Sequence, residues 1–186
     1  MPFYRQQGNV PAKRHTVFRS ESNQLYFEEL VSREGFNSLS SNIYHHQMPS
    51  VLVGTEGFTS VQTNSHSLGH GNQHIFTARL NSSGDCISAR SLLFYNVDLL
   101  VHKAHVDSSM DFLYRNGHFD ELIYVQSGNG SLLTNFGNLK FSSGDYIVIP
   151  RGVIWKMEIN EKTKLLIVES TGAIETPSKY RNRFGQ

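Results

Sequence analysis

The second half of this chain is a succession of short apolar runs separated by turn residues, and this pattern limits the fold more than any other feature. The run WKMEIN (155–160) alternates apolar and polar side chains, which is the period of a half-buried β-strand. With no helical period between them, the runs predict an antiparallel sandwich or jelly roll. The others are SLLFYNVDLL (91–100), ELIYVQ (121–126), SLLTNF (131–136), LKF (139–141), YIVIP (146–150) and KLLIVES (164–170).

The chain is therefore predicted to be mostly β, with three parts. Residues 1–86 form an irregular N-terminal arm with short strands, residues 87–172 form the β-barrel, and residues 173–186 form a tail or linker. Within the arm, LYFEELVS (25–32) fits a short helix or a strand equally well. Residues 59–84 are rich in Ser, Asn, Gly and His, which favours a surface loop.

Composition excludes several classes of partner. The chain has 186 residues, 38% of them hydrophobic and 18% charged, with a net charge of +1 and no basic run beyond Lys13-Arg14, so nucleic acid is not an expected partner. No apolar stretch is long enough to span a membrane, and MPFYRQQGNV has no apolar signal segment. The single cysteine, Cys86, fits a reducing cytoplasm and is predicted to be incidental rather than nucleophilic.

The segment GDYIVIPRGVIW (144–155) has the spacing of a metal site in the jelly-roll barrels called cupins. Five residues separate Gly144 from Pro150, with Gly152 after it, and six residues separate Glu121 from Gly128. Such barrels hold a metal through two histidines and a glutamate on one strand and a histidine on another. Ligands two apart on a strand share a face, and Pro-x-Gly shapes the turn before the last histidine. The barrel is thus predicted to be cupin-like, a double-stranded β-helix.

The ligand positions themselves hold other residues. Trp155 stands where the last histidine belongs, and Glu121 alone remains of the expected ligands. Depending on the gap before Glu121, the paired histidines fall at one of two pairs: Arg115 and Gly117, or Tyr114 and Asn116. A lone carboxylate does not hold Fe(II) or Zn(II), because three or four convergent donors are needed.

The sequence accordingly predicts no metal-binding, cofactor-binding or catalytic residue, with His118 and Glu121 as weak metal candidates only. These two are three apart and so face opposite sides of an extended strand. The favoured interpretation is a barrel interior filled by side chains, with the indole of Trp155 in the former metal position.

The remaining histidines are predicted to lie in loops or on the surface, including His102 and His105 in one probable strand. A group in the 59–84 loop, His66, His70 and His74, is a candidate lining for a substrate entrance.

Several long segments resemble homogentisate 1,2-dioxygenases, in the correct order along the whole chain. They are MPFYRQQGNVPAKRHTVFR (1–19), LYFEELVSREGF (25–36), SSNIYHH (40–46), the stretch from YRNGHFDELIYV to GDYIVIPRG (114–152), and LLIVESTGAIETPSKYRNRFGQ (165–186). The resemblance implies a cytoplasmic, oligomeric bicupin of tyrosine and phenylalanine catabolism. Members of the family open the ring of homogentisate with O2 to give maleylacetoacetate, using Fe(II) held by two histidines and a glutamate.

Those iron ligands belong to the second half of family members, whereas this chain resembles the first half only. We therefore expect a degenerate, structural and oligomer-forming cupin that is inactive alone, with the C-terminal catalytic half as its partner and Fe(II) bound outside this chain. Two alternatives stay open: a non-catalytic cupin that binds a small aromatic acid, and a standalone metallocupin that combines Glu121 with loop histidines.

Overall fold

The computed structural model describes residues 17–32, 35, 40–49, 51–58, 71–72, 74–80 and 82–180. Contacts divide the described chain into two compact units, with the boundary between Ala78 and Arg79. No helix in the described ranges is long and apolar enough to cross a membrane. The predicted limits of arm, barrel and tail stay predictions.

The N-terminal unit contains an antiparallel pair of strands, β1 (Phe27–Ser32) and β2 (Ser40–His45). The segment that fitted either a helix or a strand is therefore a strand from Phe27 onward. Cross-strand side-chain pairs support the register: Asn42 donates a hydrogen bond to Glu28 at 2.7 Å, and the ring of His45 lies 2.8 Å from the carboxylate of Glu29.

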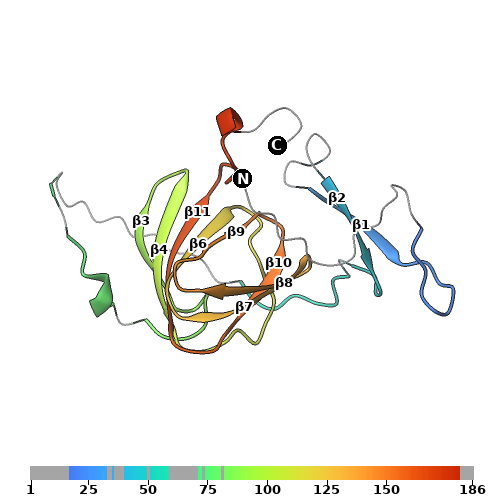
Figure 1. Ribbon diagram of the computed structural model, residues 1–186, viewed down its shortest axis with the longest axis horizontal. Coiled ribbons are helices and arrows are strands. Elements are labelled where there is room, and N and C mark those ends of the chain that lie inside the picture. The colour runs from blue at the N-terminus through green and yellow to red at the C-terminus, as the bar shows by residue number, and fades with distance from the viewer. Residues whose placement is uncertain are drawn as a thin grey trace. The chain divides into compact units, whose positions relative to one another are not determined.

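The second unit is an antiparallel barrel of two sheets, one in the order β5-β10-β7-β8 and the other β3-β4-β11-β6-β9. Figure 1 shows the strands of the larger sheet side by side, with β10, β7 and β8 on the opposite wall. This is the predicted cupin-like jelly roll. Its strands are β3 (Arg90–Tyr95), β4 (Leu99–Val106), β5 (Tyr114–Arg115), β6 (Asp120–Ser127), β7 (Asn129–Thr134), β8 (Gly137–Ser142), β9 (Tyr146–Ile149), β10 (Ile154–Ile159) and β11 (Thr163–Ser170), and 3-10 turns lie at Thr77–Arg79 and Ser178–Tyr180.

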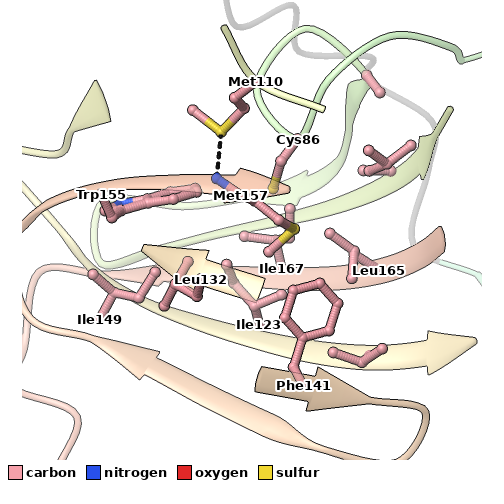
Figure 2. Close-up of a cluster of buried hydrophobic side chains, with 14 of the residues drawn as sticks. Cys86, Met110, Ile123, Leu132, Phe141, Ile149, Trp155, Met157, Leu165 and Ile167 are labelled. Carbon is pink, nitrogen blue, oxygen red and sulfur yellow. Dashed lines mark hydrogen bonds between the residues drawn. The ribbon is translucent and has the colours of Figure 1, made fainter. Parts of the chain in front are cut away.

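Both sheets contribute alternate side chains to a single core. On β10, Trp155 and Met157 are buried, as the alternation of WKMEIN predicts. Figure 2 shows them packed with the inward side chains of the opposite wall, and the Sδ atom of Met110 accepts a hydrogen bond from the backbone N–H of Met157. The buried members are Cys86, Ala89, Ala104, Val106, Met110, Ile123, Val125, Leu132, Phe141, Ile149, Val153, Trp155, Met157, Leu165 and Ile167.

A tight turn before β10 sets the direction from which Trp155 enters the core. Gly152 has φ +84°, a backbone conformation that favours glycine, and its N–H donates to the carbonyl of Asn116 at 2.8 Å. Pro150 precedes it and fixes the start of the turn. The turn that precedes the last histidine ligand in a metal-binding barrel is therefore present here, but it is followed by the indole of Trp155.

Replacing Gly130 on β7 by alanine is expected to destabilise the barrel by about 1–3 kcal/mol, or several degrees in Tm, because the new methyl group would overlap neighbouring atoms. A Cβ there would overlap the carbonyl oxygen of Glu158 and stand 2.8 Å from Cζ of Phe141. Gly117→Ala is the matched control, since nothing lies within 4 Å of a Cβ at that position. Thermal unfolding followed by circular dichroism compares the two variants, and equal Tm values would contradict this account.

Candidate functional site

The four ligand positions of the metal-site spacing do meet inside the barrel, and the structure decides between the two pairs left open by the sequence. Arg115 and Gly117 are exposed, whereas Asn116 is buried and Tyr114 is half-buried. The inward pair is therefore Tyr114 and Asn116. Tyr114 pairs with Trp155 in the β5–β10 register, and their rings meet edge to face at 5.4 Å.

The fourth position, Glu121, belongs to an ion cluster. Its side chain is fully buried, and Nη1 of Arg90 donates to its Oε1 at 2.7 Å and to Oε1 of Glu169 at 2.5 Å. The two glutamates are direct cross-strand partners on β6 and β11. Arg90 begins β3 opposite Ala104, which is fully buried in the barrel core.

Two further polar side chains complete the cluster. Nε2 of His102 lies 3.5 Å from Oε2 of Glu169, and Nδ2 of Asn116 donates to Oε1 of the same carboxylate at 3.4 Å. Asn116 is oriented by its own loop, because its Oδ1 accepts the backbone N–H groups of His118 and Phe119 at 3.1 and 3.0 Å. The amide N–H groups are thereby left to face the barrel interior.

Burial sets the protonation of this cluster. It raises the pKa of Glu121, although the Arg90 guanidinium partly opposes the shift. Burial also acts to raise the pKa of Glu169, but hydrogen bonding to His102 and the charge of Arg90 outweigh it, so that this pKa lies below its usual value. The pKa values of the two carboxyl groups are thus shifted in opposite directions. Burial likewise raises the pKa of Tyr114 to about 12.

Several polar atoms of the cluster are buried without a hydrogen-bond partner. Among the described side chains these include Nη2 of Arg90, Oε2 of Glu121 and Nδ1 of His102, and next to the cluster Nε1 of Trp155, whereas Nε2 of His102 faces Oε2 of Glu169 at 3.5 Å. Native interiors leave few such atoms unpaired, because each one costs free energy. Other such atoms belong to His105 and Asn135, outside the cluster.

The weak metal candidates are not brought together. His118 is exposed with its ring beside Phe119 and lies in a bend before β6, not on an extended strand as the sequence predicted, whereas Glu121 on β6 is fully buried. Of the loop histidines, His74 is exposed and contacts the ring of Phe76 at 4.4 Å. His66 and His70 lie outside the described residues, so the substrate-entrance role of this loop stays a prediction.

The prediction that His102 is a loop or surface residue is wrong. His102 is 8% exposed and faces inward from β4, on the same side as Ala104 and Val106. Arg90 and Glu169 were missed altogether. For Glu169 a signal was present, because it continues the inward phase of Leu165 and Ile167 in KLLIVES.

The residues at these positions do not fit a transition metal such as the one that the cupin spacing would hold. Trp155 and Tyr114 replace the imidazoles that would ligate it, and Oε1 of Glu121 is already bound by Arg90. Over the ranges that the structure describes, no three His, Cys, Asp or Glu side chains gather in a way that could hold a metal ion.

Cys86 is expected to be unreactive in the folded protein. Its thiol is fully buried, and burial raises its pKa to about 11. Because the thiolate is the reacting form, modification by Ellman's reagent should be at least about 100-fold slower in the native than in the urea-unfolded protein. Absorbance at the thionitrobenzoate band measures both rates, and similar rates would contradict the burial of this thiol.

The outer face of the larger sheet is also apolar. A row of directly paired residues crosses all five strands, and Phe94 and Val148 at its two ends are exposed. The residues of this row are Phe94, Val101, Val168, Leu122 and Val148. In the next row, Leu166, Tyr124 and Tyr146 follow one another across the strands, and the two tyrosine rings are in contact, tilted by 33° with centroids 4.7 Å apart. We refer to these two rows as the apolar outer face.

The sequence is similar to a known protein family and to a curated protein. Residues 80–178 match the family model described as homogentisate 1,2-dioxygenase N-terminal. A curated relative from Saccharolobus solfataricus, which carries the name "Putative dioxygenase", is 35% identical over 188 residues, covering 100% of this chain and 48% of that protein. The chain thus spans about half the length of the curated relative it matches.

Solved cupin structures are similar in part. A cupin-2 domain protein from Shewanella frigidimarina matches 44% of this chain and 78% of its own, with 22% identity and a TM-score of 0.40. A cupin protein from Bacteroides fragilis matches 49% of this chain and 84% of its own, with 16% identity and a TM-score of 0.42. Because the family model matches more than half of the chain, and because the whole chain is similar to part of the Saccharolobus protein, the chain belongs to the homogentisate 1,2-dioxygenase N-terminal family.

Proposed function

We propose that this chain is the structural, non-catalytic N-terminal half of a cytoplasmic homogentisate 1,2-dioxygenase. In the whole protein, Fe(II) held by the other half would support cleavage of homogentisate to maleylacetoacetate. One observation carries the proposal: the metal positions of this barrel are filled by Trp155, Tyr114 and Asn116, and the remaining Glu121 is ion-paired with Arg90. A barrel built in this way contributes shape and stability rather than ligands.

The apolar outer face supports an association role. From Leu165 to Val168, four consecutive apolar side chains alternate between the core and the outer face. The first polar residue after them is Glu169. Such continuous apolar runs are typical of strands covered on both faces. Because the curated relative is about twice as long as this chain, we propose that the second half of the same polypeptide covers this face.

The first test is activity and continuity. The purified chain, supplied with Fe(II), homogentisate and air, should consume no oxygen and form no maleylacetoacetate, whereas the same chain joined to its second half should do both. The reading frame beyond Gln186 should encode that half. Turnover by the 186-residue chain itself, or a stop codon directly after Gln186, would contradict the proposal.

The second test concerns the outer face. Val148→Lys places a charge on an exposed position of the apolar outer face, so it should weaken association between this chain and its separately produced second half while leaving the fold intact. Lys140→Glu on β8 of the other sheet is the control, and it should not affect association. Co-purification and circular dichroism measure the two effects. Unchanged association of the Val148→Lys variant would exclude this face as the contact.

A further inference from the structure

One end of the apolar outer face carries positive charge. Lys103 and His105 alternate with the inward residues of β4 and therefore point outward, and Lys164 on β11 is the direct cross-strand partner of His105. Leu166, a member of the apolar outer face, is in turn the partner of Lys103. The charged end is thus continuous with the apolar rows. We refer to Lys103, His105 and Lys164 as the basic end.

The charge of the basic end is not compensated by a neighbouring carboxylate. None of the ion pairs between described residues involves Lys103 or Lys164, and the amine of Lys103 donates to the neutral side-chain carbonyl of Gln126. Lys103 is only 4% exposed. Burial, together with the charge of Lys164, lowers the pKa of Lys103, and burial and the two lysines lower the pKa of His105.

The same face cannot supply the missing negative charge from a second copy of this chain. Among the described residues at outward positions of the five strands, the one carboxylate is that of Asp120 at the start of β6. Asp120 is fully buried and ion-paired with Arg151 at 3.1 Å. Two copies that met through this face would bring lysines together without an available carboxylate, and such like-charge contacts disfavour association.

We infer that the second half of the polypeptide meets this face with an acidic side chain, which pairs with Lys164 and compensates the buried charge of Lys103. This inference rests on the proposed function, because it specifies the chemistry of the segment that covers the apolar outer face. The occupant is thus an apolar surface with at least one Asp or Glu at the edge that faces the basic end.

The physical reason is the cost of covering a lysine. Lys164 is exposed and solvated in this chain, and a surface that covers Leu166 beside it would also remove water from its amine. An unpaired charge in an interface is strongly unfavourable, whereas an opposed carboxylate offsets the loss of hydration and fixes the register of the contact. Charge complementarity therefore determines which surface can seat on this face.

The test measures Lys164→Glu in two proteins, the 186-residue chain and the same chain joined to its second half. In the 186-residue chain, the substitution replaces a repelling charge beside Lys103 by an attracting one, so Tm should stay unchanged or rise. In the joined protein, the new carboxylate would face the acidic side chain of the second half, so Tm should fall by at least about 2 °C. Scanning calorimetry measures both shifts.

Two further variants complete the comparison. Lys164→Gln removes the charge without reversing it, so it should lower Tm of the joined protein by a smaller amount. Lys140→Glu makes the same charge reversal at an exposed lysine on β8 of the other sheet, and it should shift Tm equally in the two proteins.

Each outcome decides for or against the acidic partner. Opposite responses of the two proteins to Lys164→Glu support it, and equal responses overturn it. A dimer of the 186-residue chain that Val148→Lys disrupts would also overturn it, because a second copy would then cover this face. If Val148→Lys weakens association of the two halves but Lys164→Glu acts equally in both proteins, the proposed function stands and this inference alone fails. A stop codon directly after Gln186 would remove both.

Discussion

Replacement of Arg90 by methionine is expected to lower the free energy of unfolding by about 3–5 kcal/mol near neutral pH, because it removes the partner of buried charges. Methionine keeps much of the length and packing of the arginine stem, so the loss reports the charge rather than a cavity. Glu121 and Glu169 would be left buried and facing each other across paired strands. Like-charge repulsion then adds to the loss of the ion pairs.

The loss should depend on pH in a defined direction. In the wild type, the lowered pKa of Glu169 gives stability that is present above the carboxyl's unfolded pKa and is lost as pH falls through the folded pKa. Without Arg90, burial and mutual repulsion should raise the pKa of Glu169, which reverses the sign of its contribution, and raise further the already elevated pKa of Glu121, so that stability is lost as pH rises. The difference between variant and wild type should therefore shrink from about pH 7 towards pH 4, where the carboxyls take up protons.

Urea unfolding at the two pH values measures this effect, and the fluorescence of the protein's single tryptophan, Trp155, reports the transition because its indole is fully buried. Arg115→Met makes the same chemical change at an exposed arginine and is expected to alter stability by no more than about 0.5 kcal/mol. An Arg90→Met deficit equal at both pH values would show that packing, and not charge, is what the arginine supplies.

The strands of the barrel are readable in the sequence because each has one face in a common core. The alternation in WKMEIN indicates a pleated strand with one buried face. The turn residues around Gly128 and Gly144 indicate where neighbouring strands end. The position of Glu121 and the replacement of a histidine by Trp155 follow from spacing in the same way. Periodicity along one strand shows which residues share a face. For the strands and for the residues at the metal-site positions, this local information was sufficient.

The ion cluster could not be predicted in this way, because it depends on which strands become neighbours. Arg90 and Glu121 are 31 residues apart, and Arg90 and Glu169 are 79 apart, and only the order β3-β4-β11-β6 brings them together. Period two places His102 and His105 on opposite faces without saying which face is inside. The sequence spacing left two pairs of positions open, and only burial in the fold identifies Tyr114 and Asn116 as the inward pair.

Trp155 is the second position where a large effect is expected, since Trp155→Ala should cost about 3–5 kcal/mol through lost burial and the cavity left behind. The indole is fully buried and contacts the Tyr114 ring edge to face at 5.4 Å, so the neighbouring sheet strands cannot collapse freely into the space. Trp155→Phe should cost much less, below about 1.5 kcal/mol, because it keeps most of the packing. It also removes Nε1, which is buried without a partner in the part of the chain that the structure describes.

Both substitutions remove the only tryptophan, so urea unfolding of these variants is followed by circular dichroism. Tyr180→Ala, at an aromatic residue that is 68% exposed, provides the matched truncation and should change stability by no more than about 0.5 kcal/mol. A third substitution separates packing from ligand chemistry: Trp155→His restores the imidazole of the metal-site spacing, yet it should bind no iron, because Arg90 still holds the carboxylate of Glu121. Iron retained by Trp155→His alone would show that the guanidinium yields to a metal, and a Trp155→Ala cost as small as that of Tyr180→Ala would show that the indole does not fill the barrel.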